Sequence, residues 1–142
     1  MTLYAESSAV LAWLLGEPLG EDIREVLASA ESVITSDLTV VECDRVVARV
    51  VASGELSEAE GAALRGELSI ASAHWTMLPL APQVMDRARH RFPKESIRTL
   101  DALHLASALT AKAAAPGLVV LSLDDQVRAN ARALGFELQP SA

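Results

Sequence analysis

The chain has 142 residues and a mass of 15.0 kDa, a length that favours one domain, because domains cluster at about 100 to 150 residues. Its composition, 51% hydrophobic and 22% charged, excludes a disordered protein, since such a chain can bury enough apolar surface to offset its ordering entropy. The single cysteine, Cys43, excludes a disulfide framework and a cysteine-based zinc site. The early apolar run from Ala9 to Leu15 is too short to cross a bilayer. We therefore expect one soluble, cytoplasmic domain over residues 1–142.

The charge argues against a generally basic nucleic-acid binder but is unevenly distributed. The net charge is −7, and most acidic side chains lie in residues 1–86, whereas residues 87–142 are net positive. Five basic residues fall close together: Arg87, Arg89, Arg91, Lys94 and Arg98. They form either a solvated helix end and loop or a phosphate-contacting patch on an otherwise acidic protein.

Short β-rich runs alternate with longer helical patterns along the chain. The expected strands are residues 3–5, 32–35, 76–78, 118–121 and 136–138. The expected helices are residues 8–15, 21–30, 39–53, 57–74, 82–92, 99–114 and 126–134, with a capping-box pattern at Ser57 and Glu60. This alternation predicts an α/β fold, a central parallel sheet of four to five short strands flanked by helices on both faces. Ligands of such sheets bind outside the carboxyl ends of the strands, so chemistry is expected there.

Four carboxylates can reach that edge: Glu6, Glu42, Asp101 and Asp124. Each also has a purely structural explanation. Thr39 and Glu42 match a capping box at the start of the helix expected over residues 39–53. Asp101 lies where a helix dipole favours negative charge, and Asp124 or Asp125 can cap the last helix.

Two helices favour a functional role for these carboxylates. The helix over residues 99–114 carries leucines on almost every side, so Asp101 is expected to be buried, which is costly unless a cation pairs with it. Arg98 is its one near sequence partner. In the helix over residues 39–53, Glu42, Arg45 and Arg49 share a face, as an ion-pair ladder or as a ligand flanked by phosphate-binding arginines. Val41 and Val46 widen its apolar surface, which indicates a subunit interface.

The candidate donors are all oxygen atoms, with Ser122 adding a hydroxyl, and no cysteine or histidine cluster accompanies them. Such a set suits Mg²⁺ or Mn²⁺ and not zinc. His104 lies inside the helix expected to be buried, and we expect it to be a hydrogen-bonded core residue instead of a ligand.

Four stretches together resemble the PIN domain and, within it, the VapC-type toxins of bacterial toxin–antitoxin pairs. They are Tyr4-Ala5-Glu6-Ser7-Ser8-Ala9, Val41-Glu42-Cys43-Asp44-Arg45, Thr99-Leu100-Asp101-Ala102-Leu103-His104-Leu105-Ala106 and Leu121-Ser122-Leu123-Asp124-Asp125. They occur in the family's order and extend over the whole chain.

The resemblance implies an endoribonuclease that depends on Mg²⁺ or Mn²⁺. It makes Glu42, Asp101 and Asp124 metal ligands, and it places Glu6 where the family usually has aspartate. It also implies that Ser122 supports the last aspartate, with Asp125 as a secondary candidate. The expected RNA-binding side chains are Arg45, Arg49, Arg89, Arg91 and Arg98. A homodimer and a cognate VapB-like antitoxin are the expected protein partners.

Three other interpretations stay open. A phosphorelay receiver also has acidic residues at strand ends, but neither Lys94 nor Lys112 follows the last strand, where a receiver needs its lysine. A catalytically weak PIN-like binding module would keep the fold and the antitoxin interface without turnover. A DNA-directed or RNA-processing nuclease of the same fold would differ only in its substrate.

Overall fold

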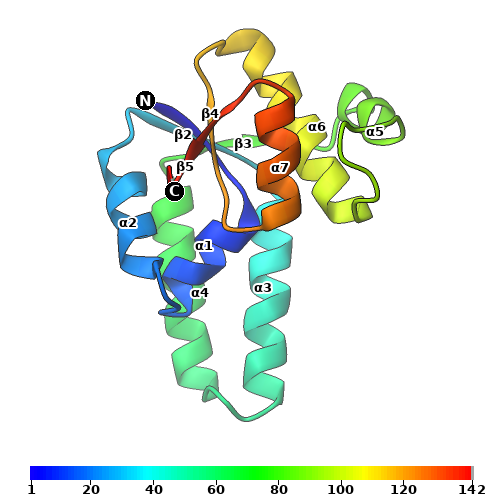
Figure 1. Ribbon diagram of the computed structural model, residues 1–142. Helices are drawn as coiled ribbons and strands as arrows, with labels where there is room; N and C mark the ends of the chain where they lie inside the picture. The colour runs from blue at the N-terminus through cyan, green and yellow to red at the C-terminus, as the bar shows by residue number, and fades with distance from the viewer. Residues whose placement is uncertain (142) are drawn as a thin grey trace.

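The computed structural model describes residues 1–141, folded as five strands and seven helices (Figure 1). The strands are β1 (Thr2–Ala5), β2 (Ser32–Ser36), β3 (Thr76–Leu78), β4 (Val119–Leu121) and β5 (Glu137–Gln139). The helices are α1 (Ser7–Leu14), α2 (Gly20–Ser29), α3 (Asp37–Ala52), α4 (Glu58–Ser72), α5 (Pro82–Ala88), α6 (Thr99–Ala114) and α7 (Asp125–Ala133).

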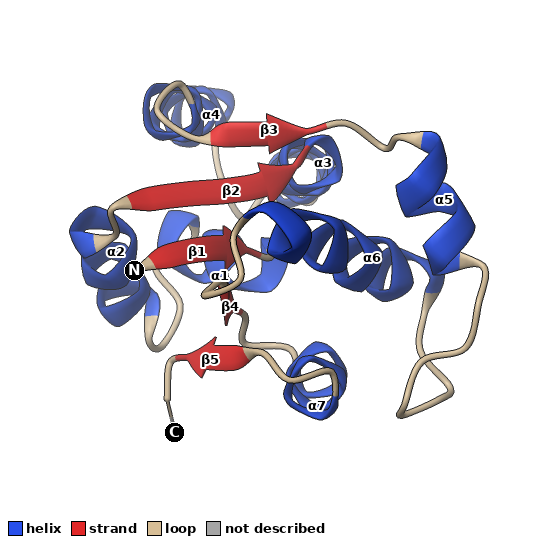
Figure 2. Cartoon of the chain, turned by 90° about the horizontal axis from the view of Figure 1, so that it is seen from above, coloured by secondary structure: helices blue, strands red, loops and turns tan. Residues whose placement is uncertain are grey.

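All strand pairs are parallel. The strand order is β3-β2-β1-β4-β5 (Figure 2). The predicted α/β class and the five short strands are therefore confirmed. The order runs outward from β1 in both directions, so β1 and β4 are neighbours although most of the chain lies between them. Parallel pairing of this kind requires helical crossovers, which supply the covering layers.

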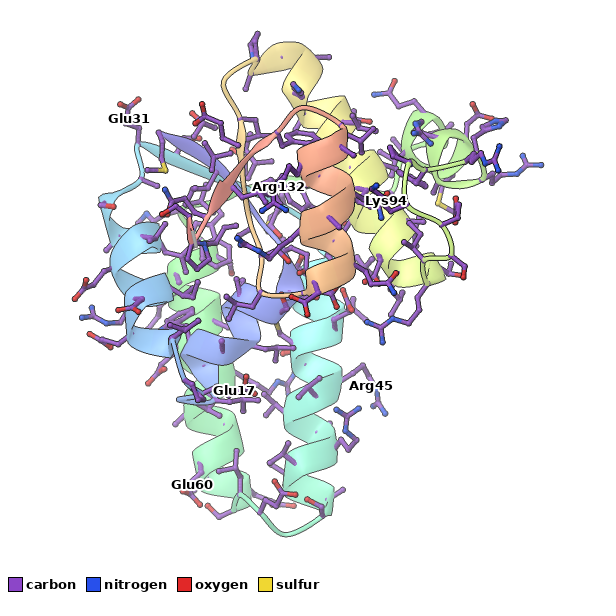
Figure 3. The ribbon with its side chains drawn as sticks, in the orientation of Figure 1. Glu17, Glu31, Arg45, Glu60, Lys94 and Arg132 are labelled. Carbon is purple, nitrogen blue, oxygen red and sulfur yellow. The ribbon has the colours of Figure 1, made fainter. Side chains whose placement is uncertain are left out.

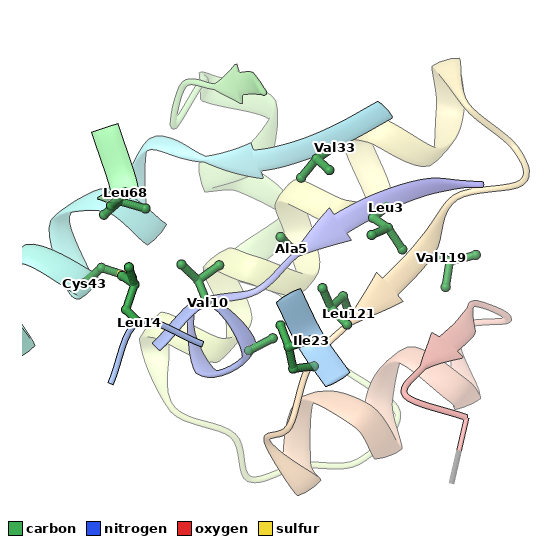
Figure 4. Close-up of a cluster of buried hydrophobic side chains, with 11 residues drawn as sticks. Leu3, Ala5, Val10, Leu14, Ile23, Val33, Cys43, Leu68, Val119 and Leu121 are labelled. Carbon is green, nitrogen blue, oxygen red and sulfur yellow. The ribbon is translucent and has the colours of Figure 1, made fainter. Parts of the chain in front are cut away.

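Alternate residues of the central strands build two separate cores, because successive side chains of a strand point to opposite faces. Leu3 and Ala5 of β1 face the first core, which α1, α2, α3 and α4 cover (Figure 4). Tyr4 of the same strand faces the second core, where it meets α6 and α7. In β4, Val119 and Leu121 join the first core and Val120 the second. Both faces of the sheet are thus buried, as the apolar strand sequences predict.

Several helix boundaries differ from the sequence prediction, and two of these differences, at the start of α3 and the end of α5, concern site residues. Helix α3 begins at Asp37, because Ser36 is its N-cap and accepts a hydrogen bond from the backbone N–H of Leu38. Thr39 is buried and its hydroxyl accepts a hydrogen bond from Thr35 instead. The expected capping box of Thr39 and Glu42 is therefore wrong, and Glu42 lies in the second turn of α3.

Helix α5 ends at Ala88, not at Phe92. Phe92 turns inward and is buried in the second core, which ends the helix and makes residues 89–98 an anchored loop. Asn130 of α7 fixes this loop, accepting from the backbone N–H of Lys94 at 2.8 Å and donating to its carbonyl at 3.0 Å. Most of the basic cluster therefore lies on this loop and at the end of α5.

Helices α3 and α4 form a hairpin that extends beyond the sheet (Figure 1). The capping box predicted at Ser57 and Glu60 is present at the start of α4, with both reciprocal hydrogen bonds. Within residues 1–141, no helix is both long enough and apolar enough to span a membrane.

Candidate active site at the carboxyl edge of the sheet

The site lies between β1 and β4, where the strand order reverses: β2 and β3 lie on one side of β1, and β4 and β5 lie on the other. The chain continues from β1 into α1 on the first core and from β4 into α7 on the second, the arrangement at which ligands of parallel sheets bind. Glu6 follows β1 directly, and its backbone N–H donates to the carbonyl of Leu121 at 2.9 Å. Asp124 is the N-cap of α7 and Asp101 lies in the first turn of α6. The fold therefore places these carboxylates at one edge, as predicted.

Glu6 is almost fully buried and is saturated with hydrogen bonds from its own neighbourhood. As the N-cap of α1, its carboxylate accepts from the backbone N–H of Ser8 at 2.8 Å. The hydroxyls of Ser7 and Ser8 donate to it at 2.8 and 2.6 Å, and the hydroxyl of Ser122 donates as well. The charge is stabilised by donors of the protein itself, although Glu6 is only 3% exposed.

This network reaches Asp124 through the chain after β4. The hydroxyl of Ser122 accepts from the backbone N–H of Asp124 at 3.1 Å, and that of Ser8 accepts from the backbone N–H of Leu123 at 2.9 Å. Glu6, Ser8 and Ser122 thereby fix the backbone that presents Asp124. The Asp124 carboxylate itself caps α7 by accepting from the backbone N–H of Val127 at 2.9 Å. The structural explanation of Asp124 as an N-cap is therefore correct.

Glu42 contacts the buried side chain of His104. The ring Nε2 of His104 is hydrogen-bonded to Glu42, and Nδ1 lies 2.9 Å from the hydroxyl of Tyr4. His104 is 1% exposed, so the expectation of a hydrogen-bonded core histidine holds, but its partner is a site carboxylate. Burial raises the pKa of the Tyr4 phenol well above its usual value, so Tyr4 stays neutral in this chain of contacts.

Asp101 and Asp124 share one cation. Nε of Arg98 lies 3.3 Å from Asp101, and Nη2 of the same guanidinium lies 3.4 Å from Asp124. Burial, followed by the charge of Asp124, raises the pKa of Asp101 above its ordinary range, although Arg98 acts in the opposite direction. The two carboxylates are therefore close enough to repel each other. The pairing of Asp101 with Arg98 expected from the sequence is observed.

The helix that carries Asp101 is less enclosed than its leucines predict. Leu100 is 45% exposed, while Asp101, Ala102 and His104 face inward. The expectation of a helix buried on nearly every side is therefore wrong at its first turn. The first turn is open to solvent on the side of Leu100.

The other predicted residues differ in how exposed they are. Ser122 is buried and Asp125 is exposed. Arg45 and Arg49 are exposed on α3, and no ion pair within residues 1–141 joins either of them to Glu42. The expected ion-pair ladder is therefore absent there. Figure 3 shows Arg45 projecting from α3 into solvent on the same side of the molecule as Lys94. Arg89 and Arg91 are also exposed.

The carboxylates of this edge differ in their fit to a divalent cation. Among residues 1–141, no three histidine, cysteine, aspartate or glutamate side chains are arranged to hold a metal ion. Glu6 is hydrogen-bonded to serines and Glu42 to His104. Asp101 and Asp124 do fit, because their oxygen atoms already share a stand-in cation, the guanidinium of Arg98.

The sequence reasoning missed the residues that support the carboxylates. Tyr4, Ser7 and Ser8 contact His104 or Glu6, and Asn130 fixes the basic loop. The spacing of Asp101 and His104, three residues apart on α6, places both on one face and was the available signal for His104. Nothing in the spacing of Asn130 and Lys94 marks their contact, because 36 residues separate them.

Comparisons with known proteins agree with this architecture. Residues 3–133 match the PIN domain. The chain is 30% identical over 134 residues to Ribonuclease VapC46 of Mycobacterium tuberculosis, which spans 94% of this chain and 93% of that protein. The chain belongs to the PIN-domain family.

Solved structures show the same fold. FitAcB of Neisseria gonorrhoeae has a TM-score of 0.70 at 21% identity, covering 97% of this chain and 96% of that one. VapC20 of Mycobacterium tuberculosis, described as a sarcin–ricin loop cleaving toxin, has a TM-score of 0.66 at 14% identity, covering 94% and 95%. VapBC2 of Rickettsia felis, solved with a fragment of promoter DNA, has a TM-score of 0.64 at 10% identity, covering 98% of both chains.

Proposed function

We propose that this protein is a Mg²⁺- or Mn²⁺-dependent endoribonuclease that acts as the toxin of a toxin–antitoxin pair in the cytoplasm. The observation that carries this proposal is the pair of Asp101 and Asp124, brought from two helices to one cation at the switch point of a PIN-domain sheet. The similarity to Ribonuclease VapC46 over nearly the whole chain supports the reaction class.

In this proposal Asp101 and Asp124 would hold the ion, with Glu42 and Glu6 as the further carboxylates of the set. A divalent ion bound there supplies an activated water and neutralises charge that develops on the scissile phosphate. Ser122, Ser8 and Glu6 keep the backbone of Asp124 in place. His104 holds Glu42 in one orientation. Asp125, exposed beside Asp124, is a secondary candidate ligand.

An acidic edge repels RNA, so phosphate contacts must come from outside it. The exposed side chains of Arg45, Arg49, Arg89 and Arg91, with Arg98, are the proposed RNA-binding group. Aromatic residues make up only 4% of the chain, which leaves little material for base stacking. Recognition is therefore proposed to depend on backbone contacts and RNA shape.

A homodimer and a VapB-like antitoxin are the proposed protein partners. On α3, Val41 is 57% exposed, so an apolar side chain is available on the outer face of the hairpin. On α4, Ile70 is 73% exposed. Exposed apolar side chains of this size support a protein contact on the hairpin.

The decisive experiment is RNA cleavage by the Asp101→Asn variant. We expect loss of cleavage of total RNA in Mg²⁺ and in Mn²⁺, because the substitution keeps the size of the side chain and removes the charge that would hold the ion. The control is Asp86→Asn, which changes an exposed aspartate of α5 and should cleave like the parent. Cleavage by Asp101→Asn at the parental rate would contradict the metal-site assignment.

A catalytically weak binding module is the second candidate function. It is favoured by the saturation of Glu6 and by the lack of a three-donor metal group in residues 1–141. The same assay separates the two candidates, because the binding module predicts no cleavage by the parent in either metal.

A further inference from the structure

Arg98 has an unusual position for a proposed RNA-binding side chain. It lies at the N-cap of α6, but its side chain makes no capping hydrogen bond. Its guanidinium instead contacts Asp101 of its own helix and Asp124, the N-cap of α7, at 3.3 and 3.4 Å. These contacts turn the guanidinium toward the candidate metal ligands, so its charge is shared with two carboxylates before any phosphate arrives.

The contact is easily broken. The side chain of Arg98 is 78% exposed, whereas those of Asp101 and Asp124 are 8% and 23% exposed. Exposed ion pairs contribute little stability, because water screens them and a long side chain loses rotamer freedom. A divalent ion carries twice the charge and can approach carboxylate oxygens to about 2.1 Å. It therefore competes favourably with the guanidinium for the same two oxygen-rich groups.

Displacement of Arg98 changes what the site offers to RNA. The ion neutralises the charge of the two carboxylates. Arg98 is then released at the N-cap of α6, beside the same carboxylates. Binding of the ion frees Arg98 for RNA, and binding of RNA to Arg98 frees the carboxylates for the ion. The ion and RNA are therefore coupled, and binding of one raises the affinity for the other. The other arginines differ in this respect, since Arg45, Arg89 and Arg91 are exposed without contact to the Asp101–Asp124 pair.

We propose that Arg98 is an exchangeable cation of the Asp101–Asp124 pair, which a divalent ion displaces so that the freed guanidinium binds the RNA backbone beside the cleavage site. This inference rests on the proposed function, because it requires that Asp101 and Asp124 bind the ion. It makes Arg98 a residue that links metal binding to substrate binding.

The first measurement is Mn²⁺ affinity without RNA, by calorimetric titration of the whole chain. Arg98→Gln should bind Mn²⁺ roughly three- to tenfold more tightly than the parent, because the competing cation is gone. Arg98→Lys keeps the charge and should bind Mn²⁺ close to the parental affinity. The control is Arg24→Gln, which removes another exposed arginine from its ion pair with Glu21 on α2 and should leave Mn²⁺ affinity unchanged.

The second measurement is binding of a fluorescent, cleavage-resistant phosphorothioate oligoribonucleotide of mixed sequence, in EDTA and in Mn²⁺. In the parent, Mn²⁺ should raise the affinity for this probe, and in Arg98→Gln most of that increase should be lost. In EDTA the two proteins should bind the probe within about twofold of each other, because Arg98 is then occupied by the carboxylates.

The outcomes separate this inference from the proposed function. If Asp101→Asn and Asp124→Asn lose Mn²⁺ but Arg98→Gln binds it no more tightly than the parent, the exchange is refuted and the metal site stands. If Arg98→Gln loses equal affinity for the probe in EDTA and in Mn²⁺, Arg98 is an ordinary phosphate contact and the exchange is again refuted. If the parent binds no Mn²⁺, both the exchange and the proposed metal site are wrong. Melting curves of each variant check that the fold is retained.

Discussion

Glu6 is held by a dense set of hydrogen bonds, because four donors converge on its buried carboxylate. The hydroxyls of Ser8 and Ser122 donate to Glu6 and at the same time accept from backbone N–H groups. An amide at this position would place an NH₂ group, which cannot accept a hydrogen bond, against hydroxyls that donate to the carboxylate, so some of their protons would lose their acceptor. Glu6→Gln should therefore lower the free energy of unfolding by about 2 to 3 kcal/mol, as expected for hydrogen bonds to a charged group.

This loss is measured by urea unfolding in EDTA, so that metal binding makes no contribution. Glu6→Asp keeps the charge on a side chain one methylene shorter and should lose less stability. Glu67→Gln, an exposed substitution on α4, serves as the control and should change stability by less than about 0.5 kcal/mol. A Glu6→Gln variant as stable as the parent would show that the network contributes little.

Asp101 makes stability depend on pH in the direction opposite to a typical salt-bridged aspartate. Burial and the charge of Asp124 raise its pKa in the folded state, so the folded protein binds a proton more tightly than the unfolded chain. The resulting stabilisation is fully present below the unfolded pKa of about 3.9 and is lost as the pH rises through the folded pKa.

Asp101→Asn should therefore raise the free energy of unfolding near neutral pH, by about 1 kcal/mol, because it removes a crowded charge. The gain should disappear as the pH falls toward the ordinary range of an aspartate. The measurement is urea unfolding of parent and variant across acid to neutral pH without divalent ions. If Asp101→Asn is less stable than the parent at pH 7, and the difference grows as the pH rises, the expected direction is wrong.

At the scale of elements, the contact of α1 with α2 depends on a glycine. A Cβ built on Gly20 would lie 2.3 Å from the carbonyl oxygen of Ala12, a backbone atom that cannot move without shifting α1. Gly20→Ala should therefore destabilise the protein by about 1 to 3 kcal/mol, the usual cost of overpacking. Gly66 of α4 has no atom within 4 Å of the same virtual Cβ. Gly66→Ala should stabilise the protein by about 0.5 to 1 kcal/mol, because alanine suits a helix interior better.

Thermal and urea unfolding should show a lower free energy of unfolding for Gly20→Ala and a higher one for Gly66→Ala, each relative to the parent. Equal effects at the two positions would mean that helix preference, and not the contact with Ala12, decides the outcome.

The elements were largely predictable from sequence because their signals are local. Alternating apolar strands and the Ser57–Glu60 capping box define the order of elements and the start of α4. The start of α3 was mispredicted because Ser36 and Thr39 are both acceptable caps, and only the contact of Thr39 with Thr35 decides between them. The end of α5 depends on burial of Phe92 in a core assembled from distant helices, which no local pattern reveals.

The candidate site was predictable in position but not in its contacts. Strand ends of a parallel sheet must meet, so Glu6 and Asp124 were expected at one edge. The sequence does not show that Glu6 is saturated by serines or that Arg98 bridges two carboxylates, because these contacts depend on side-chain directions across 116 and 26 residues. The proposed ligand Asp124 also has a structural role, because it caps α7 while it faces Arg98.

Over the whole molecule, charge is segregated in a way that suits an RNA-binding nuclease with an acidic centre. The net charge is −7, yet the end of α5 and the loop over residues 89–98 are basic and held near α7 by Asn130. An anchored loop presents its arginines together, whereas a free segment would lose entropy on binding. The basic cluster is thus expected to act on binding and not on the chemical step.

Replacing both Arg89 and Arg91 with glutamine tests this expectation. Each lost contact with a single-stranded phosphate backbone removes about 0.7 from the slope of log affinity against log salt, so the double variant should lose about 1.4. Both side chains are exposed, so the melting temperature should stay within about 2 °C of the parent, as is usual for surface substitutions.

The control replaces Arg24 and Arg65, which pair with Glu21 and Asp44 away from the loop, and should keep the parental slope. The slope is measured by fluorescence anisotropy of a labelled oligoribonucleotide over a salt series in EDTA. An unchanged slope in the Arg89 and Arg91 variant would mean that this cluster is a solvated surface, and that phosphate binding in EDTA depends on Arg45 and Arg49 instead.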